Sequence, residues 1–221
     1  MLDFHVRHFD TVEINNSFYK LPSAQTFVSW RDATPRGFCF AVKASRFLTH
    51  RKKLNEPENA INNFLPRVEE LKKKLGPILF QLPPRWHANP ERLQGLLKIL
   101  PRRHHYAFEF RDPSWMSQPI YDILRRYNAA FCIYELAGYH SPLEITADWS
   151  YIRLHGPGGR YQGRYSRQQL AAWAERIGDW GTRLKGVYVY FDNDQAGFAA
   201  KNALELRELV QSPGSLQPEA A

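Results

Sequence analysis

Short apolar runs alternate with helical patterns along the whole chain. Seven of these runs are four to six residues long, rich in β-branched and aromatic residues, and bounded by Pro, Gly or polar residues, as is typical of buried strands. The sequence therefore predicts seven strands. They are Thr11–Asn15, Phe38–Lys43, Ile78–Gln81, Tyr106–Arg111, Ala129–Tyr134, Tyr151–His155 and Val187–Asp192.

The segments between the runs carry helical spacing and helix-start signals. Apolar residues recur at helical intervals in residues 58–75, where Pro66 should kink the helix or divide it into two pieces and Gly76 with Pro77 should end it. Asn89 before a proline and Ser166 before an amphipathic stretch are typical N-caps. Strand and helix in alternation predict parallel strands joined by right-handed crossovers.

This order favours one fold class. About eight strand–helix units over about 250 residues make a closed (β/α)8 barrel. Seven strands are visible here, so we predict an α/β, TIM-barrel-like fold that lacks its first strand. The runner-up is an open doubly wound sheet, but no strand precedes the Gly-rich phosphate loop common in that fold. We expect residues 1–211 to form one barrel-like domain and residues 212–221 to be a disordered tail.

Composition adds a bias towards anionic partners. The 221 residues are 43% hydrophobic, enough for a globular core, and carry a formal net charge of +8. A positive field raises the local concentration of anions, which favours phosphate, nucleotide or nucleic acid as a partner. The alternative is that the cations only keep the protein soluble, because many lie in runs typical of solvated helix ends and loops.

Cysteine content and the N-terminus bear on location. Cys39 and Cys132 both lie inside apolar runs, so no disulfide framework and no cysteine metal site can be assigned. Residues 1–9 resemble neither a secretory signal nor a membrane span. We therefore expect a soluble, cytoplasmic protein without a membrane partner.

Polar and charged side chains gather near the carboxyl ends of the predicted strands. Residues i and i+2 of a strand lie on the same face, and α/β barrels carry their chemistry at the carboxyl ends of the strands. We therefore expect these side chains to line one site. The same-face pairs are Glu13 with Asn15, Glu109 with Arg111, Arg153 with His155, and Tyr190 with Asp192.

The carboxylates allow two interpretations. Glu13 and Glu109 could form a pair in which one acts as an acid and the other stays an anion. Alternatively, the glutamates could be compensated by Lys43, Arg111 and Arg153 in a structural ion network, because an unpaired buried charge is costly. The two interpretations are compatible.

The cations and histidines predict anion binding and proton transfer. Lys43, Arg111 and Arg153 would form a cationic floor, and the guanidinium fork suits phosphate or carboxylate. His155 is the strongest candidate for a general acid or base, and His50 is a weaker one. The alternative for a lone histidine is a hydrogen-bonded structural role.

Metals and other cofactors are not assigned. A multinuclear zinc site needs several histidines and carboxylates at strand ends, and only His155 lies on such a face. A single Mg²⁺ on Glu13, Glu109 or Asp192 stays an open alternative.

Aromatic residues complete the candidate set. Trp115 and other loop aromatics could stack on a base or a sugar, or pack in the core, and the glycine-rich loop 156–163 could close over a ligand or only be mobile. We predict Glu13, Glu109 and His155 as catalytic residues, and Asn15, Lys43, His50, Gln81, Arg111, Trp115, Arg153, Tyr190 and Asp192 as ligand-binding residues.

Several separated motifs are shared with a known family. They are HFDTVEINNSFYKLP from His8, FAVKASRFLTH from Phe40, EFRDPSW from Glu109 and YIRLHGP from Tyr151, with residues 81–84 and 190–202. These motifs, which cover nearly the whole chain, resemble the YecE-like family, domain of unknown function 72. The resemblance implies a TIM-barrel-like fold and no settled reaction. A relation to endonuclease-like and xylose-isomerase-like barrels is a fold-level analogy alone.

The start of the chain departs from that family. Its members carry an additional N-terminal segment with a Gly-Ser-Gly-Trp-type strand, whereas Met1 here directly precedes the helix before the second strand. The strands at Thr11 and Val187 would then present unpaired edges, through which a homodimer could form. A misassigned start, or a truncated and inactive barrel, is the alternative.

The function we expect is binding, with hydrolysis as a further step, of an anionic phosphorylated or nucleic-acid-like ligand at the carboxyl ends of the strands. The alternative is a noncatalytic module that binds nucleic acid or a phosphometabolite. Assignment as a hydrolase depends on fold-level analogy only.

Overall fold

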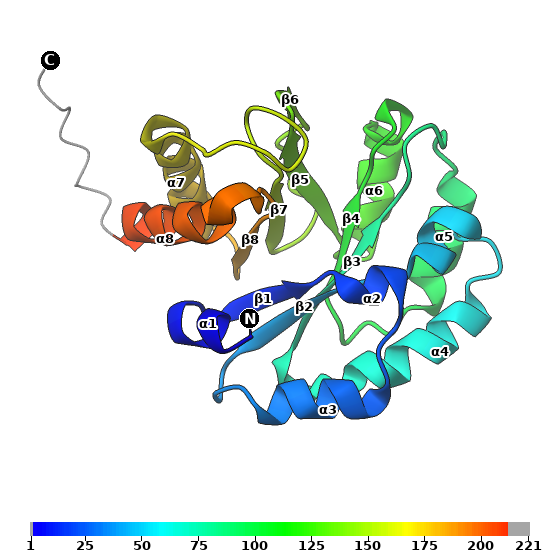
Figure 1. Cartoon of the computed structure of the whole chain (residues 1–221). Coiled ribbons are helices and arrows are strands. Elements are labelled where there is room, and N and C mark those ends of the chain that lie inside the picture. Colours follow the sequence, from blue (N-terminus) through cyan, green and yellow to red (C-terminus); the bar gives the residue numbers. More distant parts are fainter. Residues whose placement is uncertain (1, 212–221) are drawn as a thin grey trace, which may run out of the picture. The chain divides into compact units, whose positions relative to one another are not determined.

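Two compact units divide the chain. The computed structural model describes residues 2–211, and its contacts separate a first unit that ends at Phe131 from a second that begins at Cys132. Figure 1 labels the helices and strands of both units. Strand β5, Ala130–Leu136, begins in the first unit and continues in the second. The single-domain expectation stays a prediction, and the expected tail lies outside the described residues.

The sheet of the first unit is parallel. Its strands are β1 (Thr11–Ile14), β2 (Cys39–Lys43), β3 (Leu75–Gln81) and β4 (Tyr106–Glu109). These strands and the start of β5 pair in chain order. The register of neighbouring strands places Glu13, Lys43, Gln81 and Glu109 on one face, because side chains alternate along each strand.

The opposite face of this sheet is apolar and supports the helices. The helical segments are α1 (Leu2–His8), α2 (Asn16–Tyr19), α3 (Ala24–Asp32), a π-helix (Phe47–Arg51), α4 (Glu58–Val68), α5 (Pro90–Ile99) and α6 (Gln118–Arg126), with 3-10 segments at Glu69–Lys74 and Pro113–Trp115. Helices α3 and α4 pack against each other (Figure 1). Phe80 stacks on Phe108 with ring centroids 5.1 Å apart, and both side chains are fully buried. Burial of such rings is a main stabilising contribution to the unit.

Sequence signals located helix starts and misplaced one helix end. Asn89 accepts a hydrogen bond from the backbone N–H of Arg92 at 2.9 Å, so this predicted N-cap is confirmed. Pro66 lies inside α4 without ending it. The prediction that Gly76 ends a helix is wrong, because Gly76 lies within β3. A Cβ at that position would stand 2.3 Å from Cys39 Sγ, so glycine permits the close approach of β2 and β3.

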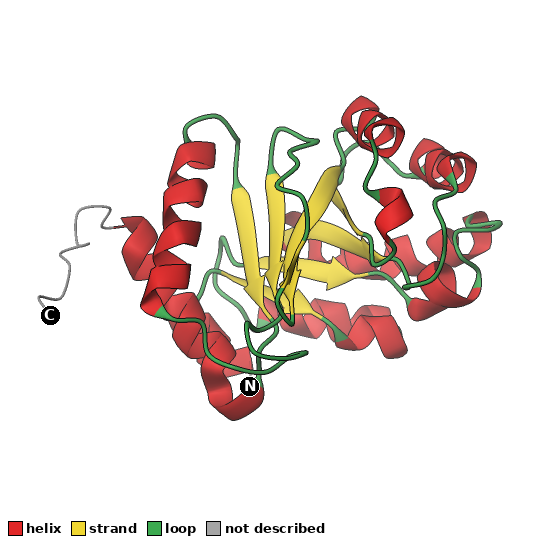
Figure 2. Cartoon of the chain, turned by 90° about the horizontal axis from the view of Figure 1, so that it is seen from above, coloured by secondary structure: helices red, strands yellow, loops and turns green. Residues whose placement is uncertain are grey.

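The second unit continues the parallel order. Its further elements are β6 (Tyr139–His140), β7 (Ser150–Leu154), α7 (Arg167–Gly181), β8 (Val187–Phe191), a 3-10 turn (Gln195–Gly197) and α8 (Phe198–Gln211). Strand β7 pairs in parallel with both β5 and β8, and α7 packs against α8; Figure 2 distinguishes strands from helices by colour. The predicted cap Ser166 is confirmed and forms a capping box with Gln169.

All seven predicted strands are present, and they pair in parallel in chain order, which confirms the strand–helix alternation. The sequence did not predict β6, since a strand of two residues is too short to show alternation. No helix among residues 2–211 is both long and apolar enough to cross a membrane.

Candidate functional site

A buried ionic cluster lies at the carboxyl ends of β7 and β8 in the second unit. The register pairs Arg153 with Tyr190, so His155 and Asp192, each two residues further on, extend from the same face. Asp192 Oδ2 accepts a hydrogen bond from Arg153 Nη2 and lies 3.1 Å from His155 Nδ1. Arg153 and His155 are 1% and 0% exposed, whereas the Asp192 side chain is 15% exposed. One carboxylate therefore holds both an arginine and a histidine.

The position of His155 defines which ring nitrogen could exchange a proton. Its backbone N–H donates to the carbonyl of Glu135 at 3.0 Å, which fixes the residue directly after β7. Nδ1 lies at ion-pair distance from the Asp192 carboxylate, and a neutral ring with its proton on Nδ1 carries its acceptor on Nε2. The imidazole also meets the ring of Tyr161 edge-on, with centroids 5.4 Å apart. Tyr161 is 44% exposed, so it connects the buried histidine with solvent.

The loop 156–163 follows His155 directly, contacts it through Tyr161 and has a constrained conformation. Gly156 has φ +109°, and a Cβ there would stand 2.2 Å from the carbonyl oxygen of Gln162. The Gly156 N–H donates to the hydroxyl of Tyr165 at 3.1 Å, and Gly159 forms an isolated bridge with Gln162. The loop is thus anchored at its base, while Arg160 at its tip is exposed.

A second buried cluster lies on the opposite face of β5. Glu135 accepts hydrogen bonds from Trp173 Nε1 and lies near His140 Nδ1, each at 2.9 Å. Burial and the neighbouring Glu135 carboxylate raise the pKa of Tyr165 above its ordinary range. Sequence reasoning missed Glu135 as a site residue, although it follows the predicted strand 129–134 directly. Glu135 points to the face opposite to that of Arg153, because Arg153 pairs with Tyr134. The available signal was a carboxylate on this second face, at the end of an apolar strand.

The first unit holds a separate pair of buried charges. Glu109 accepts hydrogen bonds from Arg111, and their side chains are 0% and 8% exposed. Gln81 lies beside Glu109 in the register, and its buried Oε1 has no hydrogen-bond partner among residues 2–211. Glu13 lies on the same face of the sheet as Glu109. The hydrogen bond described for the Glu109 carboxylate, however, comes from the cation Arg111. This arrangement agrees with the ion-network interpretation and leaves the two-carboxylate interpretation a prediction.

Cations surround His50 at the carboxyl end of β2. Burial, together with the charges of Arg46 and Lys43, lowers the pKa of His50 to about 4. The Lys43 ammonium lies 4.5 Å from the centroid of the Phe18 ring, and Phe18 meets the His50 ring edge-on at 5.1 Å. His50 Nδ1 lies 3.0 Å from Thr49 Oγ1. The strand end is therefore positively charged around a neutral imidazole.

Two predicted ligand residues, Trp115 and Tyr190, are buried among aromatic rings. Trp115 is 0% exposed, stacks on Phe110 at 4.9 Å, and donates through Nε1 to the Trp86 carbonyl at 2.6 Å. Tyr190 is 7% exposed and packs against Tyr151 at 5.1 Å. Asn15 precedes α2 without a side-chain cap bond. The Trp115 ring thus lies in the core.

The predicted residues fall into two sets, one in each unit. The structure brings Arg153, His155 and Asp192 together in the second unit, with Tyr190 on the same face. Joint roles across the two sets, such as proton transfer shared by Glu109 and His155, stay predictions. Within residues 2–211, no three or more His, Cys, Asp or Glu side chains are grouped closely enough to hold a metal ion. The other residues of the candidate set, Glu13, Asn15, Lys43, His50, Gln81, Arg111 and Trp115, lie with Glu109 in the first unit.

Sequence relatives extend over most of the chain. The UPF0759 protein YunF of Bacillus subtilis (strain 168) is 28% identical over 245 residues, which cover 95% of this chain and 86% of YunF. The UPF0759 protein YecE of Escherichia coli (strain K12) is 30% identical over 120 residues, which cover 53% of this chain and 43% of YecE. These names state no activity.

Solved structures confirm the predicted TIM-barrel-like α/β fold class. A DUF72 family protein from Thermotoga maritima MSB8 matches with a TM-score of 0.81 and 30% identity, over 92% of this chain and 85% of that chain. One from Enterococcus faecalis V583 matches with a TM-score of 0.82 and 21% identity, over 100% of this chain and 92% of that chain, and supports the fold alone. The model of the family described as "Protein of unknown function DUF72" matches residues 1–221. The chain therefore belongs to the DUF72 family, as its YecE-like motifs indicated.

Proposed function

We propose that this protein binds an anionic, phosphorylated ligand at the carboxyl ends of its strands in the second unit, and that His155 transfers a proton during hydrolysis of that ligand. One observation carries the proposal: the buried His155 imidazole, whose Nδ1 lies 3.1 Å from Asp192 Oδ2. A carboxylate at Nδ1 orients the ring and favours the tautomer with a basic Nε2, which is the arrangement used by general bases in hydrolases.

Charge around the pair supports an anionic ligand. Arg153 offsets the charge of Asp192, so the carboxylate can orient His155 without repelling a phosphate. Arg160, exposed on the loop that follows His155, supplies a cation suited to phosphate. Because His155 is fully buried, this loop has to open for Nε2 to reach the ligand.

The same contacts also favour a second candidate, a noncatalytic binding module. An arginine compensates the buried carboxylate of Glu109 and the partly exposed carboxylate of Asp192, as expected of structural ion pairs. In that case the strand ends hold a phosphorylated ligand without converting it. Turnover, and not affinity, separates the two candidates.

The test uses two probes and a matched control. Hydrolysis of bis(p-nitrophenyl) phosphate and p-nitrophenyl phosphate measures turnover, and calorimetric titration with pyrophosphate measures affinity. We expect His155→Gln to lower kcat by about 100-fold or more, the usual contribution of general acid–base catalysis, with pyrophosphate affinity retained. His140→Gln, which changes a histidine with a side chain 67% exposed in the same unit, should leave kcat unchanged.

Arg160→Gln should weaken pyrophosphate binding without changing the fold. Binding of pyrophosphate without hydrolysis of either ester supports the noncatalytic module. A protein that neither binds pyrophosphate nor hydrolyses the esters contradicts both candidates, and a His155→Gln variant with unchanged kcat contradicts the role of His155.

A further inference from the structure

Two large rings stand in solvent near the ends of β1 and β2. Tyr19, the last residue of α2, is 78% exposed, and Phe47, the first residue of the π-helix, is 48% exposed. Exposed single apolar residues are common, but these two aromatic rings lie on neighbouring segments and are both largely outside the core. π-Helical turns also occur frequently at functional sites.

Contacts between rings hold the two segments together. Phe18 meets Tyr19 edge-on at 5.0 Å on α2, and it meets His50 of the π-helix edge-on at 5.1 Å. Phe18 is buried, and the centroid of its ring lies 4.5 Å from the Lys43 ammonium at the end of β2. The contact between Phe18 and His50 therefore makes α2 and the π-helix neighbours. We call the exposed residues of these two neighbouring segments the α2–π surface; they are Tyr19, Lys20, Arg46, Phe47 and Arg51.

The α2–π surface is strongly cationic. Residues 46–53, RFLTHRKK, contain four lysines and arginines and no acidic residue. Arg46 and Arg51 are exposed, and Lys52 makes one distant ion pair with Glu56, at 3.9 Å. The lowered pKa of His50 has Arg46 and Lys43 among its causes, which agrees with an excess of positive charge here.

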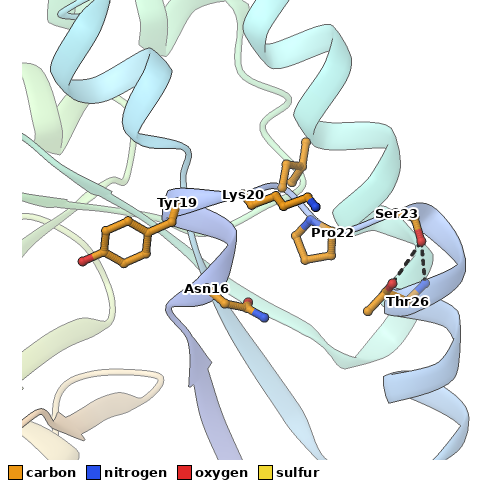
Figure 3. A pocket seen from close by; sticks show the side chains of 7 residues that line it. Asn16, Tyr19, Lys20, Pro22, Ser23 and Thr26 are labelled. Atoms are coloured by element: carbon orange, nitrogen blue, oxygen red, sulfur yellow. Dashed lines mark hydrogen bonds between the residues drawn. The ribbon is translucent and has the colours of Figure 1, made fainter.

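An open pocket adjoins Tyr19 and Lys20. It has a volume of about 610 Å³ and is lined by residues 16, 19–23 and 26, between α2 and the start of α3. Figure 3 shows the Tyr19 ring extending from α2 on the side away from Pro22, with the Lys20 side chain beside the pocket.

We propose that the α2–π surface binds single-stranded nucleic acid, whose bases stack on Tyr19 and Phe47 and whose phosphates contact Lys20, Arg46 and Arg51. Stacking on exposed rings combined with a cationic track is how proteins bind single strands without reading their sequence. Paired bases offer no free face to such rings, so a duplex gains only the phosphate contacts. This inference is independent of the proposed function, because it uses a different unit and none of the residues assigned to hydrolysis.

The test is fluorescence anisotropy with labelled oligo(dT) of about 12 nucleotides, within the usual site size of this binding mode. We expect Tyr19→Ala and Phe47→Ala each to weaken binding by about tenfold, as for loss of one stacked base. Tyr139→Ala is the matched control, because this tyrosine is 43% exposed and lies in the second unit. Because both rings are exposed, the two variants should lose affinity for oligo(dT) while keeping the melting temperature of the unsubstituted protein.

Charge variants provide a second readout. Affinity should fall with salt between roughly 50 and 200 mM, and Arg46→Gln with Arg51→Gln should reduce the slope by about two, one for each phosphate contact. Arg36→Gln, an exposed cation just before β2 at the opposite end of the strand, should leave the slope unchanged.

Several outcomes would overturn the inference. They are absence of oligo(dT) binding, equal losses in Tyr19→Ala and Tyr139→Ala, equal affinity for a duplex of the same length, or stronger binding to anionic phospholipid vesicles than to oligo(dT). His155→Gln should not alter oligo(dT) binding, so failure of the proposed hydrolase and failure of this surface can be told apart.

Discussion

Acid should weaken the fold through His50, and the direction follows from its surroundings. The pKa of this histidine falls from its ordinary value of 6.5 to about 4, first because the ring is buried and then because of Arg46 and Lys43. The imidazole therefore stays neutral in the folded protein in a range where the unfolded chain is protonated. In that range the unfolded state binds more protons, so stability is complete above pH 6.5 and declines as the pH falls towards 4.

The size of the effect can be bounded from the same values. A pKa difference between 6.5 and about 4 would correspond to roughly 3 kcal/mol for a ring fully removed from water. His50 is only partly buried, so solvent screening should reduce the contribution to about 1–2 kcal/mol. His50→Gln removes the titration and keeps a polar side chain at the site.

Urea unfolding at a series of pH values measures the difference. Between about pH 7 and pH 4 the native protein should lose about 1–2 kcal/mol more than His50→Gln, because other groups titrate equally in both. An NMR titration of the His50 ring should give a midpoint near 4. A midpoint at 6 or higher, or parallel pH profiles for the two proteins, would refute the assignment of a partly buried ring with cationic neighbours to His50.

Two further predictions concern stability and loop order. Lys74 Nζ donates hydrogen bonds to the carbonyls of Arg31 and Thr34, at and just after the end of α3, at 2.5 and 2.6 Å. Lys74→Met should therefore lower the free energy of unfolding, measured in urea, by about 1–3 kcal/mol. Lys73→Met changes an exposed neighbour and should change that free energy little. Gly156→Ala should speed tryptic cleavage at Arg160, because Gly156 has φ +109° and a Cβ there would stand 2.2 Å from the carbonyl oxygen of Gln162, which should loosen the loop. Gly158→Ala is the control: a Cβ at that position meets nothing within 4 Å, so trypsin should cleave this variant at the native rate.

The second-unit cluster shows why part of the site could be read from sequence. Arg153 and His155 are two residues apart on β7 and therefore share a face. The neighbouring parallel strand, β8, has one apolar face, and burying that face fixes the register between the two strands. These two rules suffice to bring Asp192 to them across one strand. In the first unit the register likewise pairs Glu109 with Gln81, although the sequence analysis did not predict that pairing.

Contacts that depend on helix rotation could not be read in this way. Trp173 on α7 donates a hydrogen bond to Glu135. Helical periodicity predicts which side of α7 is buried, but not how the helix is rotated against the sheet, and this rotation decides which strand residue Trp173 contacts. The core position of Trp115 likewise depends on a carbonyl acceptor at Trp86, in another loop. Spacing along the chain carries no information on such pairs, since loop conformation decides them.

The shared carboxylate links the ion-network and catalytic interpretations. Arg153 alone would suffice to offset the charge of Asp192, yet the same Oδ2 also lies at His155 Nδ1. An uncompensated carboxylate could orient the imidazole, but it would repel a phosphorylated ligand nearby. Compensation by Arg153 removes that repulsion and keeps the orienting contact. A structural ion pair is therefore what a proton-transfer histidine needs beside an anionic ligand, so only a change in turnover on loss of His155 can distinguish the two.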